Sequence, residues 1–159
     1  MKNNLNPLAV AEQTFAHEIR SLPEVSGLFG DVETGVLAAA QEDFGEKLAA
    51  LLESSLGAGI VVACTGTKGE VWRNDACGMS DVARFRVEIK TSLLMASERR
   101  QSATDLSGAI IAALDGAAFE NPFFPDGVLF AGMDVADFED LSRIATLNFE
   151  ARILLKPNR

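Results

Sequence analysis

Apolar and polar residues alternate strictly from Ala83 to Leu93, a stretch that reads A-R-F-R-V-E-I-K-T-S-L. The odd positions are mainly apolar, whereas the even positions carry charged or hydroxyl side chains. A period of two is typical of a strand with one buried face, while a helix would scatter the charges all round its surface. The stretch therefore predicts a long strand. Its charged face is either solvated surface or a docking surface, and no residue in it suggests catalysis.

The segment from Ala145 to Leu155 alternates in the same way near the end of the chain. Two such strands are natural partners in a sheet, because each has one apolar and one polar face. In an antiparallel pair, Arg86 and Glu88 could face Glu150 and Arg152 across the sheet. The register of this pair stays open.

Shorter strands are predicted in three further places. Gly59–Thr65 is rich in β-branched residues and predicts a buried strand, and Gly127–Met133 is also strand-like. Glu70–Trp72 lies between turn-prone residues and predicts a short edge strand. The acidic run Asp134–Asp140 predicts a turn.

The first half of the chain has helical patterns. Asn6 followed by Pro7 suits the start of a helix, whose apolar face extends to Leu22, and Pro23 predicts its end. A longer helix is expected from about Val32 to Leu56. Gly35 lowers the stability of that helix by about 1 kcal/mol relative to alanine, so a break near it is an alternative.

Two other segments complete the pattern. The connection Glu24–Gly30 is expected to be a linker in which Leu28 and Phe29 are exposed. Ser102 and Asp105 have the spacing of a capping box, and the apolar face that follows predicts a third helix ending at Asp115–Gly116.

The element order is helix, helix, strand, strand, helix, strand, strand, which favours one α+β domain over residues 1–159. Residues 7–56 would form an N-terminal helical pair, and residues 59–159 a sheet with one intervening helix. The sheet is expected to be mainly antiparallel, of about four strands, with helices on one face. The predicted core places Phe85, Val87, Ile89, Leu147, Phe149 and Ile153 against Phe44, Leu48, Leu52, Ile110 and Leu114.

Length, charge and composition argue against several classes of function. At 159 residues the chain suits a single core, and no apolar run reaches the roughly 20 residues that span a bilayer. The net charge of −9 argues against nucleic-acid binding, which needs clustered Lys and Arg. Only residues 59–102 are basic, with 7 basic and 5 acidic groups, which suits a protein partner of opposite charge. No membrane contact and a cytoplasmic location are expected, since the N-terminus lacks a signal-peptide pattern.

No pattern of catalytic residues is found. Cys64 and Cys77 are expected to be free thiols in a reducing compartment, with a disulfide between them as the alternative, and His17 is expected to be structural. The acidic run Asp134–Asp140 lacks the ligand spacing of a calcium loop. We therefore expect no enzyme activity, no metal and no cofactor. Phe123 and Phe124, between two prolines, are either a partner-binding knob or a cap on the core.

The chain resembles the tail-terminator proteins of long-tailed phages and prophages, also called minor tail or tail-completion proteins. The resemblance covers residues 84–159: the long alternating strand R-F-R-V-E-I-K-T-S-L-L-M-A, the polar loop S-E-R-R-Q-S, the helix T-D-L-S-G-A-I-I-A-A-L-D-G, and final strands ending L-N-F-E-A-R-I-L-L. It is a pattern of elements without a diagnostic motif.

The resemblance implies a structural protein that is made in the bacterial host cytoplasm and built into the virion tail. It would form a ring of about six copies that ends tail-tube polymerisation and joins the tube to the head connector. The alternative is a bacterial cytosolic accessory or small-ligand-binding domain without catalysis. In the ring hypothesis, the subunit interface comprises Arg84, Arg86, Lys90, Arg99, Arg100, Phe123, Phe124, Asp134, Asp137 and Asp140.

Overall fold

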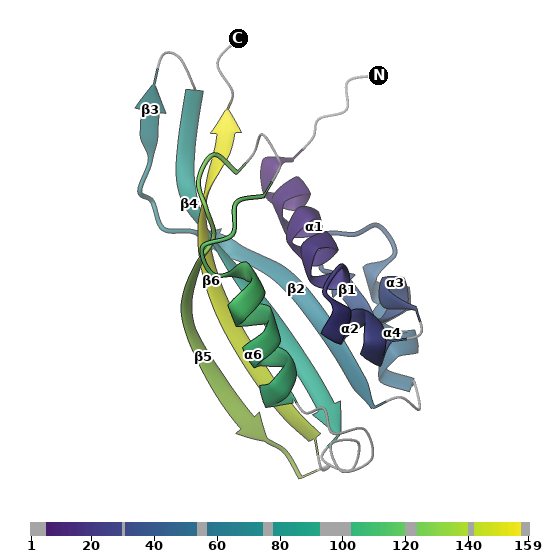
Figure 1. Ribbon diagram of the computed structural model, residues 1–159. Helices are drawn as coiled ribbons and strands as arrows, with labels where there is room; N and C mark the ends of the chain where they lie inside the picture. The colour runs from purple at the N-terminus through teal and green to yellow at the C-terminus, as the bar shows by residue number, and fades with distance from the viewer. Residues whose placement is uncertain are drawn as a thin grey trace.

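A computed structural model describes residues 6–29, 31–53, 57–74, 78–92, 103–119, 124–139 and 142–156. Within these residues, a twisted six-stranded sheet has the order β1-β2-β4-β6-β5, with β3 paired to β4 (Figure 1). The strands are β1 (Val36–Ala38), β2 (Ala58–Thr67), β3 (Trp72–Asn74), β4 (Gly78–Ser92), β5 (Leu129–Asp137) and β6 (Ser142–Lys156). The helices are α1 (Pro7–Arg20), α2 (Pro23–Leu28), α3 (Val32–Gly35), α4 (Phe44–Glu53) and α6 (Ala103–Leu114).

The two alternating segments are confirmed as strands β4 and β6, which pair antiparallel along their length at the centre of the sheet. Their register, which the sequence left open, does not place Arg86 and Glu88 opposite Glu150 and Arg152. Arg84 lies opposite Glu150, and Arg86 lies opposite Asn148. The alternation cannot distinguish these registers, because a shift of two residues leaves every side chain on the same face.

The sheet has more strands than the predicted four, and it is mixed. β2 pairs antiparallel with β4, and β5 pairs antiparallel with β6, but β1 pairs parallel with β2. The edge strand expected at Glu70–Trp72 is β3, shifted toward the C-terminus. The acidic run was predicted wrongly as a turn, since Asp134–Asp137 belongs to β5 and pairs with β6.

The N-terminal helix begins as predicted, with the Asn6 side chain accepting a hydrogen bond from the Leu8 amide at 3.0 Å. Pro23, however, begins α2, a role for which its fixed φ is suited. The linker predicted at this point is therefore wrong. Leu28 and Phe29 are buried in the core, at 5% and 4% exposure.

The single long helix predicted between Val32 and Leu56 is also wrong, since this segment contains α3, β1 and α4. The break falls after Gly35, where the alternative had placed it. A Cβ on Gly35 would lie 2.3 Å from the Phe29 ring, so the chain needs glycine there to pack on the core. The next residues, Val36–Ala38, are fully buried and extend alongside β2.

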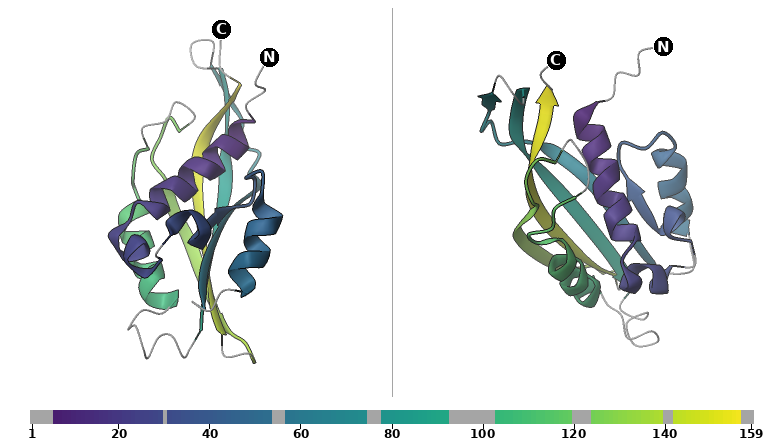
Figure 2. Two further views of the ribbon diagram at one scale, coloured as in Figure 1. Left: turned by 90° about the vertical axis from the view of Figure 1, so that its right-hand side faces the viewer. Right: turned by 45° about the horizontal axis from the view of Figure 1, so that its top comes forward.

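Helices cover both faces of the sheet, which corrects the expectation of one covered face. α1, α2 and α6 lie on one face, and α4 lies on the other beside β1 and β2 (Figure 2). A Cβ on Gly59, which alternates with the core residues of β2, would lie 2.6 Å from the Leu51 side chain of α4. This small residue lets α4 approach the outer face.

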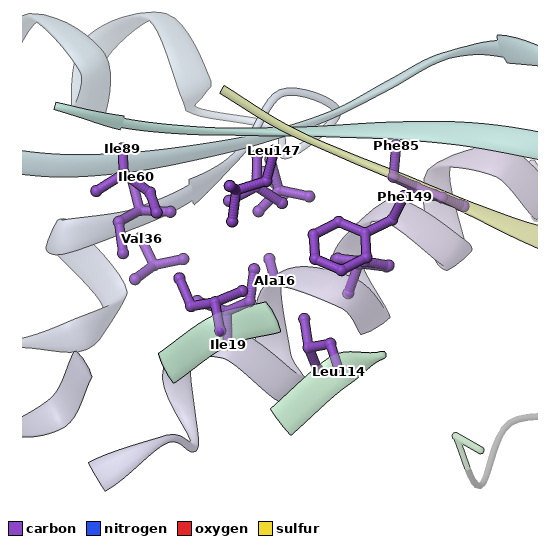
Figure 3. Close-up of a cluster of buried hydrophobic side chains, with 14 of the residues drawn as sticks. Ala16, Ile19, Val36, Ile60, Phe85, Ile89, Leu114, Leu147 and Phe149 are labelled. Carbon is purple, nitrogen blue, oxygen red and sulfur yellow. The ribbon is translucent and has the colours of Figure 1, made fainter. Parts of the chain in front are cut away.

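The core lies between the sheet and the helices α1 and α6 (Figure 3). The six predicted sheet residues, Phe85, Val87, Ile89, Leu147, Phe149 and Ile153, are all confirmed as buried. Ile110 and Leu114 of α6 pack against them as expected. Phe44, Leu48 and Leu52 do not belong to this core, and Leu52 is 64% exposed. Phe15 and Ile19 of α1 take that place.

Candidate functional site

The sheet surface turned away from α1 and α6 is densely charged. Arg84, Arg86, Glu88 and Lys90 alternate with the buried residues of β4, so they share this surface. We call it the charged outer face, and it also includes Glu150, which lies opposite Arg84. The sequence reveals this face because it lies on the central strands, in which charged residues alternate with buried core residues.

Several charges on this face are paired within the subunit. Arg86 and Glu88 form an ion pair at 3.2 Å, and the Lys68 ammonium donates to the Glu150 carboxylate at 3.2 Å. The hydrogen bond to Glu150 raises the pKa of Lys68. Arg84 is exposed, and no ion pair to it occurs within the residues that the structure covers. Arg84 is thus available to a partner.

Arg152 of β6 extends the charged outer face toward β3. Its guanidinium donates to the Ser80 hydroxyl at 3.0 Å and to the Glu70 carbonyl at 3.2 Å. At the other end of the sheet, Arg143 donates to both carboxylate oxygens of Asp137, at 2.6 and 3.0 Å. These hydrogen bonds lower the pKa of Asp137.

The structure brings only part of the predicted interface together. Arg84, Arg86 and Lys90 lie on the same face of β4, while Asp134 is exposed two strands away on β5. Asp137 is held by Arg143. Arg99, Arg100, Phe123 and Asp140 lie outside the described residues.

Phe124 caps the core, the second of its two expected roles. Its side chain is 5% exposed, and its ring lies 6.1 Å from that of Phe85 and 5.1 Å from that of Phe119. Such ring packing buries a large apolar area inside the subunit. Within this structure Phe124 does not reach the surface.

A groove of about 400 Å³ lies under α4, on the charged outer face. Leu48 and Leu51 form one wall, and Val61 and Ile144 form part of the floor. Sequence reasoning missed this groove because it assigned the apolar stripe of α4 to the core. Gly59 could have indicated the groove, because a glycine inside a strand of β-branched residues often marks the close approach of another element.

The chemistry-bearing residues do not form a catalytic arrangement in the described part of the chain. Burial raises the pKa of the Cys64 thiol, and the nearby Glu12 carboxylate raises it further, which disfavours the reactive thiolate. His17 is exposed on α1, and Cys77 lies outside the described residues. Among those residues no group of three His, Cys, Asp or Glu could hold a metal ion. No described helix is long and apolar enough to span a bilayer.

Sequence reasoning also missed a set of exposed apolar side chains near strand edges. Val71 and Trp72 are 49% and 53% exposed beside and in β3, and Leu129, Met133 and Val135 are 61%, 41% and 42% exposed on β5. Large apolar side chains gathered on a monomer surface often mark an interface.

Comparison with known proteins gives a match in structure but none in sequence. No family model matches the chain, and no curated protein matches it. Among solved structures, a chain of the virion of the native gene transfer agent (GTA) particle superposes with a TM-score of 0.60. The match has 17% sequence identity and covers 91% of this chain and 96% of the other. The protein therefore shares its fold, over nearly its whole length, with a chain of that virion.

Proposed function

We propose that the protein is a structural component of a phage or prophage tail, where it forms a ring that ends tube polymerisation and joins the tube to the head connector. The observation that carries the proposal is the likeness in fold to a chain of a GTA virion, which extends over 91% of this protein. The resemblance of residues 84–159 to tail-terminator proteins supports the same role. The ring is expected to contain about six copies.

The charge distribution supports assembly through complementary surfaces. The charged outer face carries Arg84 and Arg86, and Asp134 lies exposed on the edge strand β5. In a ring, basic groups of one copy would meet acidic groups of the next, which increases the rate of association and sets orientation. Exposed charges are screened over about 8–10 Å at ordinary ionic strength, so high salt should weaken such a ring.

The mass of the purified protein in solution tests the proposal. We expect light scattering after gel filtration to give about six times the 17.0 kDa subunit mass at low salt, and a smaller mass at high salt. Charge reversal of Arg99 and Arg100 to Glu should weaken the ring further while the thermal unfolding of the subunit stays unchanged. A matched control reverses Arg20, whose guanidinium hydrogen-bonds to Val36 within the subunit and should affect folding instead. A protein that stays monomeric at all concentrations and salts would contradict the ring.

The groove under α4 favours a second candidate, a small-ligand-binding domain. Its volume of about 400 Å³ is in the range of small-molecule sites. Its lining combines leucine, valine and isoleucine side chains with the polar residues Glu88, Lys90, Ser92 and Ser142. Screening apolar carboxylic acids by thermal shift tests this candidate. A ligand that stabilises the wild type but not a Leu51→Lys variant would favour it, and saturation without any shift would count against it.

A further inference from the structure

Within the described residues, the sheet has unpaired strand edges on two opposite sides. β5 ends the order β1-β2-β4-β6-β5 on one side. β1 and β3 lie on the other side. The pairing of β2 with β4 ends at Thr67↔Ala83, and β3 pairs with β4 beyond that point, beginning at Trp72↔Ser80. Free strand edges invite pairing with another chain, and native proteins usually protect them.

The edge of β1 is protected by its own subunit. The Arg20 guanidinium donates to the Val36 carbonyl at 2.6 and 3.1 Å, and the Gln41 side chain accepts from the Ala38 amide at 2.8 Å. All three residues of β1 are buried. No further chain is needed there.

The first part of the β5 edge has similar protection, because the Phe130 amide donates to the Asp115 carboxylate at 2.9 Å. From Met133 to Asp137, no described side chain bonds to the strand backbone. Phe138 donates its amide to Ser142 of β6, so by alternation the amides of Met133, Val135 and Asp137 point to the unpaired side. Met133 and Val135 are also more than 40% exposed. This part of β5 therefore combines exposed apolar side chains, the carboxylates of Asp134 and Asp137 and unpaired backbone amides, and an unpaired edge is a template for an additional strand.

The second edge belongs to the β3 arm, which we define as Val71–Asn74 together with Gly78–Ser80 of β4. In the part of the chain that the structure describes, β3 pairs with no strand other than β4. Figure 1 shows this arm at the end of the sheet remote from α6. Buried Asp81 holds its base, since its carboxylate accepts from the Val82 amide at 2.7 Å and from Thr67, Gly69 and Glu70. Burial would raise the pKa of Asp81, but these hydrogen bonds lower it overall. The arm therefore presents Trp72 from a fixed base.

The arm and the β5 edge complement each other in chemistry. Each combines backbone edge groups with exposed apolar side chains, Trp72 on the arm and Met133 and Val135 on β5. The arm adds Arg73, whose guanidinium donates to the Met79 sulfur at 3.6 Å, and β5 adds the exposed carboxylate of Asp134. Trp and Arg are the residue types that most often dominate interface energies.

We infer that the β3 arm of one copy pairs with the β5 edge of the next copy, which makes a head-to-tail contact. The two free edges lie on opposite sides of the sheet, so the arm of a subunit does not pair with the β5 edge of the same subunit. Repetition of the contact between successive copies produces a closed ring or an open filament. The inference rests on the proposed function, because it names the surfaces through which the ring would form.

Two blocked variants test the contact. The edge-blocked variant carries Met133→Lys and Val135→Lys, and its arm is intact. The arm-blocked variant carries Val71→Glu and Trp72→Glu, and its β5 edge is intact. All four positions are exposed, so both variants should fold, which circular dichroism and thermal unfolding can verify. Gln13→Lys and Gln13→Glu, on the exposed surface of α1, are the matched controls.

Each blocked variant alone should be a monomer in light scattering, whereas both controls should assemble like the wild type. An equimolar mixture of the two blocked variants should stop at a dimer of about twice 17.0 kDa, because only one intact arm and one intact edge remain to pair. Asp134→Lys added to the arm-blocked variant should weaken this dimer about tenfold, and Arg73→Glu added to its partner should restore it.

The outcomes separate this contact from the ring itself. If the blocked variants still form wild-type rings, or if their mixture stays monomeric while the wild type assembles, the arm–edge contact is wrong and the ring proposal stands. If the blocked variants fail to assemble alone but their mixture forms full rings, the interface is not head-to-tail and the inference is overturned. A wild-type protein that never assembles overturns both proposals.

Discussion

At the scale of single residues, three phenylalanines hold the helices to the sheet. The ring of Phe15 on α1 lies 5.0 Å from that of Phe85 on β4 and 5.3 Å from that of Phe149 on β6. All three side chains are at most 1% exposed. The cluster joins the N-terminal helix to the two central strands, so it links elements more than 60 residues apart in the chain.

We predict that Phe85→Ala or Phe149→Ala lowers the free energy of unfolding by about 3–5 kcal/mol, because each change removes buried apolar area and leaves a cavity. Urea unfolding followed by circular dichroism measures the loss. Phe138→Ala is the control, since Phe138 is 49% exposed, and it should change stability by less than about 0.5 kcal/mol. Equal effects of the three substitutions would contradict this core.

Glu12 is a buried carboxylate in α1, at 5% exposure, that the sequence does not single out. It accepts hydrogen bonds from the backbone amides of Ala40, at 2.5 Å, and Cys64, at 2.7 Å. These amides follow β1 and lie near the bulge in β2, where the regular pairing is interrupted. The Glu12 carboxylate therefore supplies hydrogen-bond acceptors to two backbone amides for which the sheet provides none.

Burial raises the pKa of Glu12 above its ordinary value of 4.5, although the two amide hydrogen bonds oppose this shift. Between 4.5 and the raised pKa, the folded state binds more protons than the unfolded state. The free energy of unfolding contributed by Glu12 should therefore fall as pH rises through that window. In Glu12→Gln this fall should be absent, as urea unfolding across pH 4–7 can measure. An unchanged pH dependence would refute the assignment.

At the scale of elements, close packing at one glycine decides where helix gives way to strand. The space for a Cβ on Gly35 is filled by the Phe29 ring, so alanine there would displace this buried ring. We predict that Gly35→Ala destabilises the protein by about 1–3 kcal/mol through overpacking.

Gly108→Ala provides the contrast for the glycine prediction. It lies in α6 with no atom within 4 Å of the added Cβ, so it should stabilise by about 0.5–1 kcal/mol through helix propensity. Thermal unfolding of the two variants compares them directly. If Gly35→Ala stabilised the protein, the close packing at Gly35 would be wrong. The result would instead indicate that α3 continues as the long helix that the local sequence pattern predicts.

At the scale of the whole molecule, the sheet is most strongly paired at its centre. Strand β4 is hydrogen-bonded to β2 on one side and to β6 on the other between Ala83 and Thr91. We predict that amides of this segment exchange with solvent most slowly, because exposing them requires global unfolding. Amides of Met133–Asp137 on edge strand β5 should exchange faster in the monomer. Hydrogen exchange with mass spectrometry measures both, and slower exchange on β5 in a monomer would contradict this order.

The sequence alone determined the elements whose pattern is local. The alternation in β4 and β6 and the apolar faces of α1 and α6 follow from strand and helix periods, so their existence and their buried residues were predictable. The charged outer face was predictable for the same reason, since Arg84, Arg86 and Lys90 alternate with the core residues.

Tertiary structure alone decided features that depend on contacts distant in sequence. Val36–Ala38 becomes a strand because β2 offers an edge and Glu12 and Gln41 satisfy nearby amides. α4 has an amphipathic pattern that suits either face of the sheet, and Gly59 directs it to the outer one. The register of β4 and β6 and the exposure of the β5 edge likewise follow from pairing, because a period of two specifies a face but not a partner.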